Sequence, residues 1–113
     1  MHAIFPEIIT QLPEAEISLP GVKSFLAQAG NRQFIFMSFD ENVQVPEHAH
    51  AAQWGVVLDG EMELTIDGTK RLLKKGDSYF IPRGVRHSAL IKKGYKDLNL
   101  FDEKNRYRVK QGQ

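Results

Sequence analysis

The stretch that decides the fold runs from residue 54 to residue 74 and reads WGVVLDGEMELTIDGTKRLLK. In its middle part the apolar residues Met62, Leu64 and Ile66 alternate with acidic and hydroxyl side chains. This period of two is typical of a strand with one buried face, so these three residues are expected to face the core. Two Asp-Gly pairs supply the residues of tight turns. The stretch therefore predicts a three-stranded meander, with strands at 54–58, 61–66 and 70–74.

The rest of the chain shows the same rhythm. Short apolar runs broken by turn residues recur about every eight to ten residues, and no long segment repeats every 3.6 residues. In the run 34–39 both alternating faces are mostly apolar, so both should be covered. A short helical turn is expected near 5–11. The pattern predicts an all-β sandwich or barrel, whose further strands lie at 22–29, 33–39, 77–81, 87–91 and 96–101.

The composition is that of one globular domain. The chain has 113 residues, of which 42% are hydrophobic and 26% are charged. No apolar run approaches the roughly 20 residues of a membrane span, and no secretory or transit pattern opens the chain, so we expect a cytoplasmic protein. The absence of cysteine restricts any metal to nitrogen and oxygen ligands. The expected division is an N-terminal arm over 1–20, a barrel over 21–103 and a basic tail over 104–113.

Charge is divided unevenly along the chain. Residues 1–69 hold ten acids and two bases, whereas residues 70–113 hold four acids and thirteen bases. A fold that interleaves early and late strands mixes these halves on its surface, and no nucleic-acid-binding motif accompanies the basic residues. We therefore expect neither a nucleic acid nor a membrane as partner. The alternation over 104–110 is typical of a solvated strand or a frayed end.

Two histidines, His48 and His50, stand one residue apart just after Pro46. Alternate residues of a strand point to the same face, so both imidazoles can reach one ion at about 2.0 to 2.1 Å. An isolated pair at this spacing also occurs by chance as two surface histidines. The spacing alone leaves both interpretations open.

The residues that follow extend the pattern. Gln53 and Gly60 come after the histidines with six residues between them. A second group stands further along as Gly76, Pro82, Gly84 and His87. This ordered set, over residues 42–91, resembles the two signature motifs of the cupin family. The resemblance implies a single-domain cupin-type β-barrel, also described as a double-stranded β-helix or jelly roll.

The resemblance also implies that His48, His50 and His87 bind one divalent metal ion. Gly76 and Gly84 are expected at tight corners. Binding needs neutral imidazoles, so metal affinity is expected to fall as the pH drops through about 6. The sequence does not select the metal, because the donor set suits iron, manganese, cobalt, nickel, copper or zinc.

Gln53 departs from the family's pattern, which has a glutamate at this position. An amide oxygen contributes only a dipole, so three histidines and Gln53 leave a divalent ion with its full charge. Such a site favours an anionic substrate. Gln53 is either a metal ligand or a partner that hydrogen-bonds a ligand histidine. Glu47 neighbours His48 and is expected to face the other way.

Other side chains are candidates for the pocket around the metal. Tyr79 is a candidate for acid or base catalysis and is equally an ordinary strand aromatic. Arg83 and Arg86 flank Gly84 at the expected barrel mouth, where they either guide an anionic ligand or are only solvated. The remaining candidates for the pocket wall are Trp54, Phe36 and Met37. Aromatic and methionine side chains in strands are equally ordinary core residues.

Several functions stay open at this point. The first is a metal-dependent enzyme acting on a small organic molecule, with O₂-dependent cleavage as the leading reaction and metal-assisted isomerase or lyase chemistry next. The second is a non-catalytic cupin that binds or senses a metal or small ligand, and the third is a purely structural protein. Compact cupins often dimerise by pairing strands, so we expect a homodimer that covers the apolar edge strand 22–29.

Overall fold

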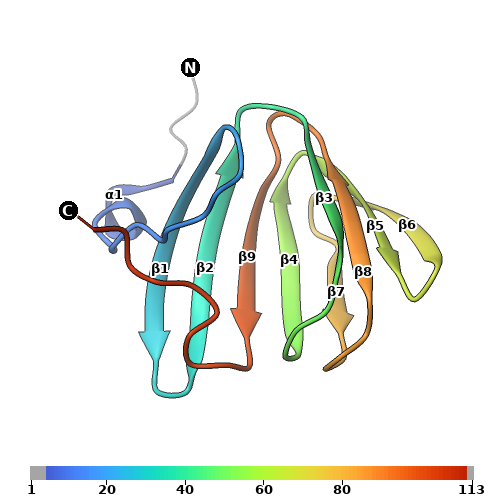
Figure 1. Ribbon diagram of the computed structural model, residues 1–113. Coiled ribbons are helices and arrows are strands. Elements are labelled where there is room, and N and C mark those ends of the chain that lie inside the picture. The colour runs from blue at the N-terminus through green and yellow to red at the C-terminus, as the bar shows by residue number, and fades with distance from the viewer. Residues whose placement is uncertain (1–4, 112–113) are drawn as a thin grey trace.

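The computed structural model describes residues 5–111, which fold into two antiparallel sheets (Figure 1). The first sheet, in spatial order, contains β1 (Val22–Ala29), β2 (Arg32–Phe39), β9 (Lys96–Phe101), β4 (Gln53–Asp59) and β7 (Ser78–Ile81). The second contains β3 (Val43–His48), β8 (His87–Ile91), β5 (Glu61–Ile66) and β6 (Thr69–Lys74). A short helix, α1 (Glu7–Thr10), precedes them, as the expected helical turn. The all-β jelly roll is confirmed.

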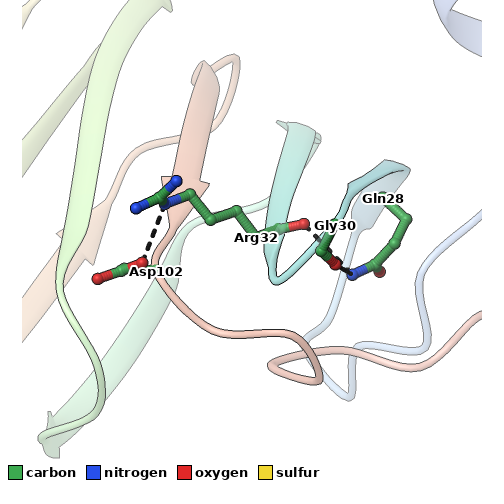
Figure 2. A network of polar contacts seen from close by, with 4 residues as sticks. All are labelled: Gln28, Gly30, Arg32 and Asp102. Carbon is green, nitrogen blue, oxygen red and sulfur yellow. Dashed lines mark hydrogen bonds and ion pairs between the residues drawn. The ribbon is translucent and has the colours of Figure 1, made fainter.

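Turn residues explain why most strand ends are predictable. β5 and β6 are joined by Asp67 and Gly68, both at positive φ (48° and 80°), which is the conformation of a type I′ hairpin. β1 and β2 are joined by Gly30 and Asn31. Figure 2 shows the turn between β1 and β2, where the Gln28 side-chain amide donates to the carbonyl oxygens of Gly30 (2.9 Å) and Arg32 (3.3 Å).

The meander expected over 54–74 is wrong at its first turn. β4 pairs with β7 and β9, whereas β5 pairs with β6 and β8, so the chain passes from one sheet to the other at Asp59-Gly60. Gly60 has φ +72°, and a Cβ on it would lie 2.8 Å from the Tyr95 Cα. A crossing between sheets needs a glycine here just as a hairpin turn does. The Asp-Gly pair therefore could not distinguish a crossing from a hairpin.

The core lies between the sheets. Met62 and Leu64 are each 3% exposed, and Ile66 packs against the same cluster, as expected. Side chains from both sheets also line an open cavity of about 310 Å³. The space between the sheets therefore holds both the core and this cavity.

The N-terminal arm and the C-terminal segment cover the β1 side of the first sheet (Figure 1). The backbone of Leu26 donates to Pro13 (2.8 Å) and that of Ala15 donates to Ser24 (3.3 Å), so the arm occupies the free edge of β1. Glu16 donates to Arg108 in turn (2.8 Å). The edge of β1, which was expected to pair with a second chain, is thus covered by this chain itself. The C-terminal segment is hydrogen-bonded to the arm rather than frayed, since the backbone of Lys110 also donates to Glu14 (2.8 Å).

Residues 1–4 of the expected arm and 112–113 of the expected tail lie outside the described residues. Between residues 5 and 111, no helix is long and apolar enough to span a membrane.

Candidate metal centre

Three histidines from two distant segments converge on the cavity. His48 ends β3 and is the register partner of His87, which begins β8, while His50 lies two residues beyond the end of β3. Their candidate ligand nitrogens all lie within 4.8 Å of one another. The pairing of β3 with β8 brings two of the rings together, so the alternation of a strand, on which the sequence argument rested, does not by itself position His50.

A loop and a ring hold His50 in place. The backbone N–H of Gly84 donates to the carbonyl oxygen of His50 (2.9 Å), so the loop of the second motif fixes the backbone of the first. The imidazole also packs edge-on against Phe101, with ring centroids 5.5 Å apart. At Pro46, which has no N–H to donate, the register of β3 and β8 shifts before His48.

Each imidazole presents the same nitrogen to the cavity. The Nδ1 atoms of His48, His50 and His87 lie 2.8, 2.7 and 3.0 Å from backbone carbonyl oxygens. Because a carbonyl oxygen only accepts, each Nδ1 carries the proton, and in the neutral ring Nε2 keeps its lone pair. Backbone carbonyls in this position are typical partners of metal-binding histidines. They are contributed by Pro46, Ala51 and Val85.

The spacing of these lone pairs fits one shared cation. The Nε2 atoms of His50 and His87 lie 3.1 Å apart. Two nitrogens bound to one ion at about 2.1 Å, with an angle between about 90° and 109°, are separated by about 3.0 to 3.4 Å. Two unprotonated nitrogens repel each other at this distance unless a cation lies between them. The donor set therefore suits a divalent metal that accepts imidazole ligands.

The surroundings favour the neutral rings that metal binding requires. The pKa of His50 is lowered to about 4, mainly by burial and also by the nearby positive charge of Arg106, against the opposing hydrogen bond to Ala51. Burial is also the main cause that lowers the pKa of His87. Proton competition at His50 is thus expected near pH 4, below the value of 6 expected from an unperturbed histidine.

Gln53 belongs to a polar network beside the histidines. Its Nε2 donates to Asn99 Oδ1 (2.9 Å), which also accepts the Tyr79 hydroxyl (2.7 Å). With its amide nitrogen committed to Asn99, Gln53 keeps its carbonyl oxygen for another partner, and the residue lines the same cavity as the three histidines. Burial raises the pKa of Tyr79 well above its usual value, so its hydroxyl stays protonated.

A buried carboxyl also lines the cavity. Asp97 is 4% exposed, and its Oδ1 has no hydrogen-bond partner among the described residues. Burial raises the pKa of Asp97 to about 7, against the lowering effect of Asn99 and Tyr95. In the sequence Asp97 is a single acid on a strand that alternates apolar and polar residues. It is identified as a cavity residue only by the structure, in which it pairs with Met37 and Val57 and points inward.

The comparisons with known proteins follow this geometry. A family model described as "Cupin domain" matches residues 35–102, which is 68 of the 113 residues. The chain belongs to the cupin family. The matched range contains all three converging histidines and Gln53, so the resemblance carried by the two motifs is confirmed.

Individual relatives support the fold more than a particular activity. This cupin is 35% identical over 75 residues to a mannose-1-phosphate guanylyltransferase of Escherichia coli (strain K12), covering 64% of this chain and 16% of that protein. It is 38% identical over 58 residues to a quercetin 2,3-dioxygenase of Bacillus subtilis (strain 168), covering 50% of this chain and 17% of that protein. The chain thus spans less than a fifth of either relative's length.

A solved structure matches over most of its length. The crystal structure of an RmlC-like cupin from Shewanella frigidimarina has a TM-score of 0.73 and 28% identity to this chain. The match covers 85% of this chain and 87% of that one. The cupin architecture therefore extends beyond the range matched by the family model.

The pocket candidates of this cupin are only partly brought together. Tyr79 and Met37 line the cavity. Trp54 is 41% exposed on the opposite face of β4, and Phe36 packs its ring against Phe5 on the same outer face. Strand parity explains both, because Gln53 and Met37 are inward and their neighbours therefore point outward.

The structure supplies a different arginine from those expected. Arg83 and Arg86 do not line the cavity, and Arg86 pairs with Glu47 on the surface (3.1 Å). Glu47 thus faces away from the metal centre, as expected. Arg106 lines the cavity instead, with its guanidinium carbon 5.7 Å from the Phe101 ring centroid. Sequence reasoning missed it because the alternation over 104–110 is typical of a solvated segment.

Proposed function

We propose that this cupin is a divalent-metal-dependent enzyme that acts on a small organic anion, with O₂-dependent cleavage of the dioxygenase type as its reaction. The observation that carries the proposal is the convergence of three Nε2 lone pairs on a cavity of about 310 Å³. In this proposal His48, His50, His87 and the Gln53 carbonyl oxygen are the metal ligands. A relative that is named as a quercetin 2,3-dioxygenase supports this choice of reaction.

The cavity supports a small substrate. Its volume lies at the lower end of the about 300 to 1,000 Å³ found for ligand pockets. Most of its wall is apolar, so it holds a hydrocarbon or aromatic body away from water. A divalent ion bound by the histidines would supply Lewis-acid chemistry or a site for O₂.

Arg106 supports an anionic substrate. Its Nε is buried without a hydrogen-bond partner among the described residues. The side chain stacks on Phe101, and Phe101 in turn contacts the His50 ring. A carboxylate or enolate oxygen next to the metal would satisfy both the buried Nε of Arg106 and the uncompensated charge of the ion.

Asp97 favours a second reaction class that the same site can perform. A carboxyl with a pKa of about 7 gives up and takes back a proton near neutral pH, as a general acid or base does. Proton transfer to or from a metal-bound substrate without O₂ is isomerase or lyase chemistry. Asp97 rather than Tyr79 is the candidate base, because burial keeps the Tyr79 hydroxyl protonated.

The test is turnover by defined metal forms. Metal-free protein loaded in turn with Fe(II), Mn(II), Co(II) or Ni(II) is incubated with diketones, hydroxy acids and hydroxylated aromatic acids, while O₂ uptake and substrate loss are recorded. The proposal predicts O₂ uptake coupled to substrate loss in at least one form, and a decrease of about tenfold or more in Arg106→Gln. Glu47→Gln, which alters a carboxylate that faces away from the site, is the matched control.

Anaerobic repetition separates the reaction classes. Substrate conversion that persists without O₂ and is lost in Asp97→Asn identifies the isomerase or lyase alternative. Ligand binding by the metal-loaded protein without any conversion in either atmosphere would identify a binding cupin and contradict the proposed enzyme.

A further inference from the structure

The segment that follows β9 belongs to no strand over residues 102–107, yet it forms part of the cavity wall. We call residues 102–107 the strap. Arg106 and Tyr107, at its end, both line the cavity. Just beyond the strap, the carbonyl oxygen of Arg108 accepts the backbone N–H of Glu16 (2.8 Å). The strap therefore needs other partners to hold its backbone between β9 and the arm.

The side chain of Gln33 supplies such a partner. Its Nε2 donates to the carbonyl oxygen of Tyr107 (2.9 Å), and its Oε1 accepts the backbone N–H of Tyr107 (2.9 Å). One side-chain amide thus pairs with both backbone groups of one residue, as a neighbouring residue does in an antiparallel ladder. Gln33 is only 2% exposed, so water does not compete for these bonds. The backbone of Tyr107 is fixed by a buried contact.

A second glutamine extends this anchor. Gln28 lies opposite Gln33 in the register of β1 and β2, and its Oε1 accepts a hydrogen bond from the Gln33 Nε2 (3.0 Å). The Gln28 Nε2 in turn donates to the carbonyl oxygen of Lys104 (3.1 Å). Figure 2 shows a further link, in which Arg32 pairs with Asp102 (3.0 Å). The β1-β2 hairpin therefore holds the strap at its beginning, middle and end.

This anchor lies one residue from Arg106. The guanidinium carbon of Arg106 is 4.8 Å from the Tyr107 ring centroid, and the Phe101 ring that it also faces packs against His50. Phe101 is itself the register partner of Gln33 on β9. None of the ion pairs among residues 5–111 involves Arg106. Packing and an anchored backbone, rather than a carboxylate, thus hold this positive charge near the histidines.

We propose that Gln33 is a positioning residue of the substrate site, which fixes the backbone of Tyr107 and so keeps Arg106 at the cavity to select a carboxylate over its neutral amide analogue. This inference rests on the proposed binding of an organic anion. Within residues 5–111 Gln33 does not line the cavity, so it acts only through the strap. A guanidinium on a fixed backbone loses less conformational freedom when an anion binds, which raises the affinity.

Isothermal titration of the Zn(II)-loaded full chain with benzoate and with benzamide measures this selection. The two probes have nearly the same size and differ in charge. All variants keep the three histidines, so a change in the benzoate-to-benzamide affinity ratio reports on Arg106 rather than on the ion. We expect Arg106→Gln to lower the ratio by about tenfold, the loss of one charged hydrogen bond. Gln33→Met should lower it by at least about threefold and leave the benzamide affinity unchanged.

A double-mutant cycle separates positioning from a general loss of structure. Because Gln33 acts through Arg106, Gln33→Met should lower the ratio no further once Arg106→Gln is present. Gln28→Met changes an exposed position of the same anchor, so it preserves the buried site and should lower the ratio by a smaller factor. Gln44→Met makes the same substitution at an exposed position of β3, away from the strap. It is the matched control and should leave the ratio unchanged.

The possible failures are distinguishable. A ratio that falls in Arg106→Gln but keeps its wild-type value in folded Gln33→Met and Gln28→Met would overturn this inference alone. Equal weakening of both probes in Gln33→Met, or an additive loss in the double variant, would show that Gln33 only supports the structure and would overturn it as well. A wild type without preference for benzoate, or a ratio unchanged in Arg106→Gln, would contradict the proposed anion site and this inference with it.

Discussion

The Nε2 atoms of His50 and His87 lie 3.1 Å apart, and the Nδ1 of each ring lies within 3.0 Å of a backbone carbonyl oxygen. Backbone geometry thus determines which nitrogen of each ring faces the other. His50 and His87 are separated by the thirty-six residues 51–86. They are held so that their Nε2 lone pairs point at the same place. Backbone carbonyl oxygens can preorganise a metal centre in this way.

The role of Gln53 can be separated from that of the histidines. Gln53→Glu places a full negative charge where we propose an amide ligand, so divalent metal should bind about tenfold more tightly or better, which is about 1.4 kcal/mol. Isothermal titration of metal-free protein with Mn(II) or Zn(II) measures the change. An unchanged affinity would show that Gln53 acts only through Asn99, to which its amide nitrogen donates.

The ionisation of His50 should report on Arg106. We expect the ring of His50 to stay neutral until about pH 4 in metal-free protein, and its pKa to rise in Arg106→Gln, because one nearby positive charge is removed. Histidine NMR signals followed against pH provide the measurement. Titration of His50 near the ordinary value of 6.5 would be inconsistent with its burial beside Arg106.

Asp97 should make stability depend on pH in a particular direction. The folded pKa of about 7 lies above that of the unfolded chain, so between these values folding takes up a proton and the free energy of unfolding falls as the pH rises. The slope should reach up to about 1.4 kcal/mol per pH unit and vanish above pH 7.

Comparison with Asp97→Asn isolates this effect. Urea unfolding of both metal-free proteins across the same pH range cancels the contribution of the histidines, which titrate in both. We expect the wild type to lose stability relative to Asp97→Asn as the pH rises toward 7. A difference between the two proteins that stays constant with pH would rule out a raised pKa for Asp97.

Gly55 lies directly against Tyr79 and Asn99, the two residues that Gln53 joins in the polar network. A Cβ on Gly55 would collide with the Tyr79 ring and hydroxyl and with Asn99 Oδ1. Gly55→Ala should therefore cost about 1 to 3 kcal/mol of unfolding free energy, the usual range for overpacking. Removing the hydroxyl with Tyr79→Phe should recover part of that loss in the double variant. Equal stability of wild type and Gly55→Ala in urea would contradict this packing.

Local sequence signals predicted the strands better than their partners. Alternation at 61–66 and turn residues such as Asp67-Gly68 act over a few residues, and the corresponding hairpin is present. Asp59-Gly60 carries the same signal, but the chain changes sheet there because β4 pairs with β7 and β9. Which strands meet depends on packing between distant segments, and short patterns carry no information about it.

The same distinction applies to the site. The three histidines could be named because their motifs have a fixed spacing, and Glu47 could be excluded by strand parity. Arg106 and Asp97 could not be identified, because the alternation over 104–110 is typical of a solvated segment and a single buried acid has no local signal. Trp54 was a candidate for the pocket wall from its residue type alone, whereas in the structure it lies beside Phe80 on the outer face.

The metal content of the purified protein tests the central claim most directly. Metal-free protein is incubated with excess divalent metal, desalted, and assayed by elemental analysis, with circular dichroism confirming the fold of each variant. We predict one ion per chain in the wild type and in Glu47→Gln, and a loss of most of the bound metal in His50→Ala. Absence of stoichiometric metal in the wild type, or full occupancy in a folded His50→Ala variant, would contradict a metal centre built by these three histidines.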